Sequence, residues 1–364
     1  MSVRKINFGA GPAKIPEEVL LKVQDETLNY ENLGVSVLEI SHRSKEFAVL
    51  LNETKQLLRE LMKVPDNFEI LFMQGGGSGQ FAAIPLNLKG EHSYADYIVT
   101  GAWSQKAAAE ASKFIEVKKV FTPAKPYVTV PDQDSWSHDE NAAYLYYCAN
   151  ETVHGIEFTP RAPPTNVPLV ADISSNFLAR PFDFTNHGVV FGGTQKNLGA
   201  AGLTVVFVRK DLIGKEQAVT PAVFSYKEMI ANNSLYNTPP CGSIYITNLV
   251  LKWIKNKGGV DAIYEMNLKK AKLIYDIIDN SDGFFHCGVD KRFRSIMNIC
   301  FRIGGPQGDE SLEEKFLKGS LERNMISLKG HRSVGGIRAS LYNAVNLEET
   351  QKLAEWMNEF ETQK

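Results

Sequence analysis

Residues 189–207 read V-V-F-G-G-T-Q-K-N-L-G-A-A-G-L-T-V-V-F. The apolar run Val189–Phe191 stops at two glycines, and a second apolar run begins at Leu203 after more small residues. Apolar runs bounded by glycine predict two strands with a tight crossing between them. Lys196 falls at this crossing, among side chains too small to cover it.

A lysine in this position can act as a nucleophile. At a strand end among apolar strands its amine loses part of its solvation, which lowers the pKa and leaves an unprotonated nitrogen. The alternative is a plain hairpin whose Lys196 side chain points into water. The rest of the sequence favours the chemical interpretation.

Length and composition are typical of a globular protein. The chain has 364 residues, enough for two domains with a large core. Hydrophobic residues make up 43% and charged residues 23%, which is an ordinary balance. Because the net charge is only −2, no bulk field attracts the chain to nucleic acid or to a membrane surface, and we expect neither as a partner.

Cysteine usage and the N-terminus predict a cytoplasmic location. The four cysteines have no C-x-x-C spacing, which argues against a structural zinc site or a disulfide framework and fits a reducing compartment. The first residues contain no apolar run long enough for a signal peptide, and no run reaches membrane-spanning length. We expect no metal. The cysteines are Cys148, Cys241, Cys287 and Cys300.

Five further apolar runs are separated by helical patterns or long crossovers. This alternation predicts an α/β fold with a mostly parallel sheet covered by helices on both faces. Polar residues at the ends of such strands collect at the carboxyl edge of the sheet, where α/β proteins bind ligands. The runs are 70–73, 97–100, 117–121, 144–148 and 167–173, and the residues expected to converge at this edge are Ser78, Trp103, Thr152, Asp172 and Lys196.

A glycine-rich loop follows the first of these strands. Residues 74–80 read Q-G-G-G-S-G-Q, and we expect a helix from about Gln80. A strand, a glycine loop and a helix start together offer free backbone N–H groups to a phosphate. A plain turn is the alternative, because three glycines alone are a weak signal.

Helical spacing and capping residues mark elements outside the sheet. Pro16 suits a first helical position, and the apolar face of its helix is expected to run from Val19 to Leu28. Ser44 can cap the helix that follows. Residues 215–243 show little periodicity, which predicts a long functional loop.

Gly258-Gly259 separates two helical patterns and is our expected domain boundary. Residues 16–258 would form a large cofactor-binding domain and residues 259–364 a smaller α+β domain, with residues 1–15 extending along the small domain. The small domain's expected strands are 296–303, 326–328 and 337–341, and its expected helices are 260–279, 312–323 and 347–360.

One cofactor suits a phosphate loop, an aromatic ring, a carboxylate and a lysine at one sheet edge. Pyridoxal phosphate needs a lysine amine, an acidic partner for its pyridinium nitrogen and donors for its phosphate. The interval from Asp172 to Lys196 leaves room for one strand unit at 182–191, which puts the acid and the amine on neighbouring strands. Taken alone, Asp172 could instead cap the turn in D-I-S-S-N.

Nine motifs in this order resemble the phosphoserine aminotransferases, a family of class V aminotransferases. The resemblance runs from about residue 6 to the C-terminus. The motifs are N-F-G-A-G-P-A (7–13), S-H-R-S (41–44), Q-G-G-G-S-G-Q-F (74–81), T-G-A-W-S (100–104), A-N-E-T-V-H-G (149–155), D-I-S-S-N (172–176), G-G-T-Q-K-N (192–197), Y-N-T-P-P (236–240) and K-G-H-R-S-V-G-G-I-R-A-S (329–340).

The resemblance implies a fold, an activity and an assembly. It implies a large cofactor domain, a small C-terminal domain and a homodimer with active sites at the interface. The implied reaction is a reversible ping-pong transamination between 3-phosphohydroxypyruvate plus L-glutamate and O-phospho-L-serine plus 2-oxoglutarate, in serine biosynthesis.

The same resemblance implies roles around the cofactor ring. Lys196 would form the Schiff base and shuttle the proton at the substrate Cα. Asp172 would pair with the pyridine nitrogen, Trp103 would stack on the ring, and Thr152 would lie near the phenolic oxygen.

For the cofactor phosphate, the resemblance implies Gly77, Ser78 and Gln195 from the same subunit, and Asn237 and Thr238 from the neighbouring one. Bacterial members of the family carry an arginine where this chain has Ser78. Only the backbone and hydroxyl contacts are therefore carried over at this position.

For the substrate, the resemblance implies two sets of contacts. Arg338 would bind the α-carboxylate. His42, Arg43, His331 and Arg332 would form the pocket for the substrate phosphate or the glutamate side chain. The arginines suit this pocket better than the histidines, because a guanidinium pairs bidentately with a phosphate.

Structural interpretations of the same residues stay open. Trp103 could be the first core residue of its helix, His42 and His331 could pack in their loops, and Arg43 and Arg332 could be ordinary surface cations.

Two other functions also stay open. A desulfurase of the same fold needs a reactive cysteine on a mobile loop; Cys241 lies in a suitable loop, although Pro239-Pro240 stiffen it. An inactive binding or scaffold protein is the alternative from another class, and the presence of every expected cofactor residue weighs against it.

Overall fold

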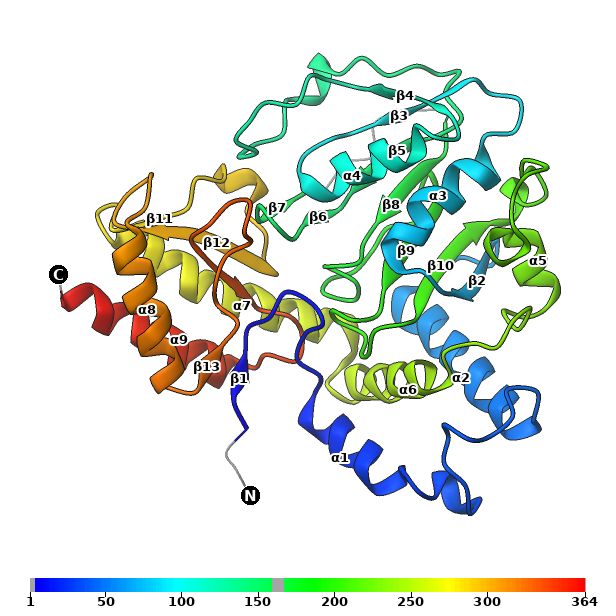
Figure 1. The fold of residues 1–364 in the computed structure, drawn as a ribbon, viewed down its shortest axis with the longest axis horizontal. Helices are drawn as coiled ribbons and strands as arrows, with labels where there is room; N and C mark the ends of the chain where they lie inside the picture. The colour runs from blue at the N-terminus through cyan, green and yellow to red at the C-terminus, as the bar shows by residue number, and fades with distance from the viewer. Residues whose placement is uncertain (1–3, 159–166, 364) are drawn as a thin grey trace.

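A seven-stranded sheet is the centre of the larger part of the molecule (Figure 1). The computed structural model describes residues 4–158 and 167–363. The strands are β2 (Phe68–Met73), β3 (Tyr94–Tyr97), β4 (Glu116–Lys119), β5 (Leu145–Cys148), β8 (Leu169–Asp172), β9 (His187–Gly193) and β10 (Thr204–Arg209). Their order is β2-β10-β9-β8-β5-β3-β4. Only β10 runs antiparallel to its neighbours, so the prediction of a mostly parallel sheet is confirmed.

Helices cover both faces of this sheet (Figure 1). The covering helices are α2 (Lys45–Met62), α3 (Gly76–Leu88), α4 (Ala102–Ala111) and α6 (Cys241–Asn256). Alternate residues of a strand point to opposite faces. In β10, Val205 and Phe207 join the core that includes α2 and α6, whereas Val206 and Val208 join the core that includes α3 and α4. A strand buried on both faces therefore reads as an unbroken apolar run.

The smaller part of the molecule is a three-stranded antiparallel sheet with helices beside it (Figure 1). The N-terminal strand joins this part, because Ile6 of β1 pairs in parallel with Met325 of β13. The division into two domains at the predicted boundary stays a prediction. The elements are β1 (Ile6–Asn7), α7 (Gly259–Asn280), β11 (Phe285–His286), β12 (Asn298–Ile303), α8 (Glu310–Glu322), β13 (Met325–Ile326), β14 (Ile337–Ser340) and α9 (Leu347–Thr362).

The first helix is shorter than its apolar pattern predicted. Helix α1 spans Glu17–Glu26, with Pro16 just before its first residue rather than within it. Leu28 lies beyond the end of the helix and is 85% exposed, so its inclusion in the apolar face of this helix was wrong. The predicted cap of α2 is confirmed, because the Ser44 side chain accepts a hydrogen bond from the backbone N–H of Phe47.

The glycine-rich loop is part of a helix. Helix α3 begins at Gly76, four residues before the predicted start at Gln80. The turn from strand to helix is made at Gly75, whose φ of +93° is accessible to glycine and unfavourable for other residues. The glycines therefore form the first turn of α3 instead of a loop ahead of it.

Residues 215–243 are more regular than predicted. They contain the short helix α5 (Tyr226–Ala231), and α6 already begins at Cys241. Tertiary packing stabilises the short helix α5 and the first turn of α6, although the sequence of this segment shows little periodicity. The strand expected at 97–100 is also displaced, because β3 ends at Tyr97.

No helix among residues 4–158 and 167–363 is long and apolar enough to cross a membrane.

Candidate active site

A cavity of about 270 Å³ lies at the carboxyl edge of the central sheet, beyond the ends of β8 and β9. Every side chain predicted to converge at this edge lines it. The structure thus brings these residues together, while their individual roles stay predictions. The predicted residues that line the cavity are Gly77, Ser78, Trp103, Thr152, Asp172, Gln195 and Lys196.

Lys196 lies in the turn between β9 and β10, and its side chain is half-buried. Its amine donates a hydrogen bond to Oγ1 of Thr152 across 2.7 Å. Burial lowers the pKa of the Lys196 amine, and the charge of Asp172 partly opposes this shift. Strands β9 and β10 do form an antiparallel hairpin, but the Lys196 side chain lines the cavity instead of pointing only into bulk water.

Asp172 ends β8, directly beside β9, as the interval to Lys196 predicted. Its Oδ1 accepts two hydrogen bonds from Ser174, from the backbone N–H at 2.9 Å and from the hydroxyl at 2.6 Å. Burial raises the pKa of the Asp172 carboxyl, and the Ser174 hydrogen bonds and the Lys196 charge oppose the rise. Oδ1 thus stabilises the turn after β8. No described residue donates a hydrogen bond to Oδ2. Oδ2 lies near Gly77, because a Cβ placed on that glycine would be 3.8 Å from it.

The N-terminus of α3 forms the wall of the cavity near Asp172. No side chain among the residues that the structure describes caps this helix end, and the first backbone N–H groups of an α-helix have no partner within the helix. Gly77 and Ser78, in this first turn, line the cavity. A helix N-terminus carries a partial positive charge, so the wall suits an anionic group such as a phosphate.

Trp103 is held in place by Glu151, a residue that was not among the predicted site residues. The fully buried carboxylate of Glu151 accepts hydrogen bonds from the backbone N–H groups of Trp103 (2.9 Å) and Ser104 (2.8 Å) and from the Ser104 hydroxyl (2.5 Å). A Cβ at Gly101 would come within 2.4 Å of this carboxylate, which explains the glycine. In the sequence, the available signal was a glutamate inside the A-N-E-T-V-H-G motif, just after an apolar run.

The Trp103 indole faces the cavity with an unused donor. Its ring centroid lies 5.5 Å from the Lys196 amine. Its Nε1 is buried and has no hydrogen-bond partner among the described residues. A tryptophan that served only as a core residue would be expected to satisfy this N–H.

The N-terminal segment also contributes to the site, which was not predicted. The backbone N–H of Ala13 donates a hydrogen bond to the carbonyl of Gln195 at 2.9 Å. Gly11 has a φ of +131°, and a Cβ there would lie 3.2 Å from Cγ of Lys196. The glycines of N-F-G-A-G-P-A therefore let the backbone approach the lysine closely.

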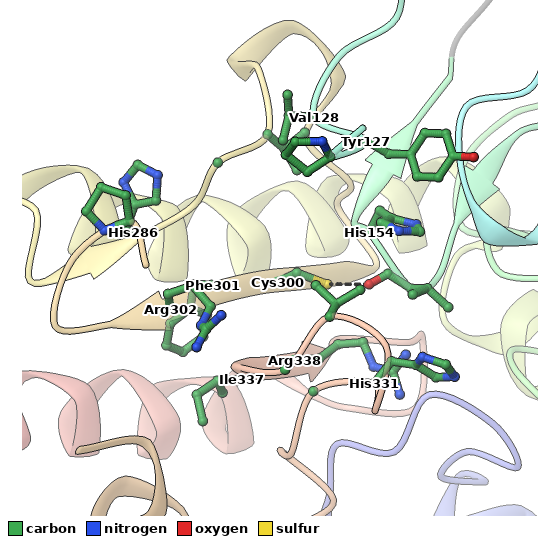
Figure 2. A pocket seen from close by; sticks show the side chains of 18 of the residues that line it. Tyr127, Val128, His154, His286, Cys300, Phe301, Arg302, His331, Ile337 and Arg338 are labelled. Carbon is green, nitrogen blue, oxygen red and sulfur yellow. Dashed lines mark hydrogen bonds between the residues drawn. The ribbon is translucent and has the colours of Figure 1, made fainter. Parts of the chain in front are cut away.

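A second cavity, of about 450 Å³, contains Arg338 and His331. Figure 2 shows these two side chains together at one end of it, with His154 and Tyr127 across from them. Arg338 donates a hydrogen bond to the carbonyl of Thr152 at 3.3 Å, so Thr152 contacts both Arg338 and Lys196. Burial and the charge of His331 lower the pKa of His154 to about 4, which keeps His154 neutral.

Five predicted residues line neither cavity within one chain. The guanidinium groups of Arg43 and Arg332 are exposed and form no ion pair with a described residue. His42 has a buried Nε2 without a partner among the described residues. The carbonyl of Thr238 accepts a hydrogen bond from Gln74 at 2.8 Å, beside the strand that leads to the glycine turn. Asn237 is next to it and half-buried.

Comparison with known proteins places the chain in a family. The profile of the family "Aminotransferase class-V" matches residues 6–353. A "Probable phosphoserine aminotransferase" from Caenorhabditis elegans is 80% identical over 98% of this chain and 97% of its own length. The "Phosphoserine aminotransferase" of Drosophila melanogaster is 55% identical over 98% of both chains. The chain belongs to the class-V aminotransferases.

Solved structures share the fold over the full length. The phosphoserine aminotransferase from Bacillus circulans subsp. alkalophilus is 43% identical, with a TM-score of 0.95 over 100% of this chain and 99% of that one. A phosphoserine aminotransferase from Trichomonas vaginalis with bound PLP is 42% identical, with a TM-score of 0.94 over 98% of this chain and 100% of that one.

Proposed function

We propose that this chain is a phosphoserine aminotransferase that uses pyridoxal phosphate. It catalyses the reversible ping-pong transfer of an amino group between L-glutamate and 3-phosphohydroxypyruvate, which gives O-phospho-L-serine and 2-oxoglutarate in serine biosynthesis. The observation that carries the proposal is one cavity. It combines the Lys196 amine, the Asp172 carboxyl and an uncapped helix N-terminus.

The residues of this cavity fit the cofactor. Oδ2 of Asp172 has no donor among the described residues, as suits the partner of a pyridinium N–H. The first turn of α3, with Ser78, offers donors to a phosphate. Gln195 lines the same cavity and can add an amide donor. The unpaired indole N–H of Trp103 marks a place where a polar group of the bound cofactor or substrate is expected.

The chemistry is divided between the cofactor and the protein. When bound, pyridoxal phosphate supplies an electron-accepting ring that stabilises negative charge at the substrate Cα. Asp172 keeps the ring nitrogen protonated by charge complementarity. Lys196 takes the proton from Cα and returns it, for which a lowered pKa is useful because the amine is then an unprotonated base. Thr152 orients this amine through its hydroxyl.

Substrate binding is assigned to the cations beside the second cavity. Arg338 binds the α-carboxylate, since its guanidinium lies against the Thr152 carbonyl, directly beside the proton-transfer group. His331 and Arg332 recognise the phosphate or the side-chain carboxylate from the loop before β14. Burial and the charges of Arg338 and Arg332 lower the pKa of His331, so binding of a phosphate dianion would favour its protonated form.

We further propose a homodimer with shared active sites. We assign His42, Arg43, Asn237 and Thr238, which lie outside their own chain's cavities, to the site of a partner. Arg332 also lies outside, but it directly follows His331, which lines the second cavity of its own chain. The segment 28–49, which carries His42 and Arg43, exposes apolar side chains that a second copy would cover. These are Leu28, Leu33, Val35, Leu38 and Val49.

Two further assignments belong to the proposal. A cytoplasmic location is supported by free cysteines at all four positions, as expected in a reducing compartment. The boundary between residues 16–258 and 259–364 is supported by Gly258, which has a φ of +98° between α6 and α7.

The desulfurase alternative fits the structure less well. Cys241 is the first residue of α6, and its thiol contacts the carbonyl of Pro239 at 3.5 Å instead of extending from a mobile loop. Burial raises the pKa of the Cys241 thiol, which reduces its fraction of reactive thiolate. It also lines neither of the two cavities described above.

The proposed function is tested with the purified protein. We expect an absorbance band from bound pyridoxal phosphate, and phosphoserine formation from 3-phosphohydroxypyruvate and glutamate. A protein that binds the cofactor but forms no phosphoserine would disprove the substrate assignment. A protein that binds no cofactor would disprove the proposed function and support the alternative of an inactive binding or scaffold protein.

A further inference from the structure

Lys106 places a positive charge beside the first turn of α3. It is in the second turn of α4, and its ammonium group donates a hydrogen bond to Oγ of Ser78 across 3.0 Å. Ser78 itself lines the cofactor cavity. In the sequence, Lys106 falls in an ordinary helical pattern that gives no sign of a binding role.

Trp103 links this second lysine to the site. The Lys106 amine lies 5.3 Å from the indole centroid, and the Lys196 amine lies 5.5 Å from the same centroid. Lys106 follows Trp103 by one helical turn, and the carboxylate of Glu151 anchors the start of that helix. The position of Lys106 is therefore set by the same contacts that position Trp103.

The described lining of the cavity has no cation that is free to pair with a phosphate dianion. Among the described residues that line the cavity, Lys196 is the single cation, and it is committed to the reacting end of the cofactor. A phosphate dianion would otherwise meet only uncharged donors, from the helix N-terminus, Ser78 and Gln195. Lys106 forms no ion pair with a described carboxylate, so its charge is available.

We propose that Lys106 is a phosphate-binding residue of the cofactor site. Its ammonium group, held by Ser78 and Trp103, pairs with the phosphate of pyridoxal phosphate and makes the site prefer the phosphorylated cofactor to pyridoxal. The inference rests on the cofactor assignment of the proposed function. It goes further by naming a cation for the phosphate, toward which the described lining of the cavity otherwise offers only uncharged donors.

The test compares two ligands that differ only in the phosphate. Apoprotein is titrated with pyridoxal phosphate and with pyridoxal, and binding is followed by cofactor absorbance. Lys106→Met keeps the apolar stem without the charge, and Lys106→Arg keeps the charge. Lys113→Ala, which removes an exposed lysine just after α4 that pairs with Glu110, is the matched control.

We expect Lys106→Met to weaken pyridoxal phosphate binding by about three- to tenfold, the range for a partly exposed charged contact, and to leave pyridoxal binding within about twofold. Lys106→Arg and Lys113→Ala should bind both ligands like the wild type. Added salt should weaken pyridoxal phosphate binding less in Lys106→Met than in the wild type.

Three results would overturn the assignment. They are an unchanged affinity of Lys106→Met for pyridoxal phosphate, an equal loss for both ligands, and an equal salt dependence in the variant and the wild type. If Lys106→Met does not fold, Ser78→Arg in a Lys106→Gln background replaces it. Restored preference for pyridoxal phosphate in that double variant supports the need for a cation here, and no restoration counts against it. A wild type that binds neither ligand disproves the cofactor assignment instead.

Discussion

The amine of Lys196 donates a hydrogen bond to the hydroxyl of Thr152 across 2.7 Å, and the backbone carbonyl of Thr152 accepts another from Arg338. One residue therefore contacts both the proposed proton-transfer group and the proposed carboxylate-binding group. Thr152 lies in the turn between the short strands β6 (Asn150–Glu151) and β7 (Ile156–Glu157). In the proposed mechanism, the hairpin of β6 and β7 therefore sets the distance between the base and the group that binds the α-carboxylate.

Replacing Lys196 with alanine should remove catalysis while cofactor binding persists. A general base contributes about 10²–10⁴-fold to such reactions, so we expect the rate of phosphoserine formation to fall by at least about a hundredfold. The phosphate-binding wall is separate from the lysine, so binding of pyridoxal phosphate should remain measurable. A coupled assay for 2-oxoglutarate, using phosphohydroxypyruvate and glutamate, measures the rate.

Added methylamine is the control for this variant. A small amine that enters the vacated space should restore part of the activity of Lys196→Ala, because only the base is missing. Normal turnover in Lys196→Ala without added amine would refute the assignment of the base.

Glu151→Gln should destabilise the protein and loosen Trp103. The carboxylate accepts three hydrogen bonds at the start of α4, and an amide has only one oxygen to accept them. A buried donor left without a partner costs about 1–3 kcal/mol, so the free energy of unfolding should fall by that amount. Urea unfolding of the apoprotein measures it, with Glu110→Gln on the solvent side of α4 as the control. Equal stability of the two variants would show that the carboxylate is not needed.

The site residues at the strand ends were predictable because the signal for each lies in its sequence neighbours. Asp172 follows an apolar run directly, and Lys196 is preceded by Gly-Gly, so alternation alone places both at one sheet edge. Glu151 and Gly11 were not found because their contacts come from tertiary packing. Glu151 accepts a hydrogen bond from Ser104, which lies 47 residues earlier in the chain. Gly11 lies close to Lys196 although it belongs to the N-terminal segment.

Two errors arise from tertiary context that local sequence patterns do not encode. Helix α3 begins at Gly76 although glycine is the poorest helix former after proline, because the strand end and the core behind it fix the first turn. Leu28 fits the apolar spacing of α1 but lies outside the helix, on the surface that we assign to a dimer contact. Periodicity cannot distinguish a face buried in the chain's own core from one that is available to a partner.

Acid sensitivity should depend on His187. This buried ring bonds to the Tyr147 hydroxyl at 2.8 Å and the Thr185 carbonyl at 3.0 Å, and burial lowers its pKa to about 4. The unfolded chain has a histidine pKa of about 6.5, so it binds the proton first as the pH falls. Stability from the neutral ring is therefore present above about pH 6.5 and is lost as the pH falls toward 4.

We expect the free energy of unfolding to fall by about 2–3 kcal/mol at pH 4 through this ring. The variant His187→Gln should not show this fall, because an amide can replace both hydrogen bonds without titrating. Urea unfolding at pH 7 and pH 4.5 provides the comparison. A variant as acid-sensitive as the wild type would assign the effect to other groups, such as His154, whose pKa is also about 4.

Variants of Arg332 and Arg338 should differ in which substrates they affect. A hydrogen bond to a charged group is worth about 1.5–3 kcal/mol, so Arg332→Leu should lower kcat/KM for phosphoserine by roughly ten- to a hundredfold, with a smaller loss for glutamate. Arg338→Leu should reduce both alike, because both substrates present the same α-carboxylate. Unphosphorylated serine should be a poor substrate of the wild type, because it leaves the basic pocket unpaired. Equal losses for both substrates in Arg332→Leu would exclude the phosphate pocket.

Mixed dimers test whether two chains share each site. Neither Asn237 nor Thr238 lines its own cavity, so the proposal assigns both to the cofactor phosphate of the partner. Lys196→Ala should be inactive, and a variant with alanine at both loop positions should be strongly impaired. In a heterodimer of the two, one site combines the intact lysine of one chain with the intact loop of the other. Refolding an equimolar mixture should therefore recover about a quarter of wild-type activity, because half of the dimers are mixed and each holds one complete site.

The same experiment separates a shared site from a site within one chain. Native mass spectrometry of differently tagged chains measures the fraction of heterodimers. Activity that rises with this fraction supports the shared site, because neither parent alone can supply both parts. Heterodimers that form at the expected fraction and stay inactive would place the 237–238 loop in its own subunit. The hydrogen bond from Gln74 to the Thr238 carbonyl would then be the contact through which the loop acts on the glycine turn.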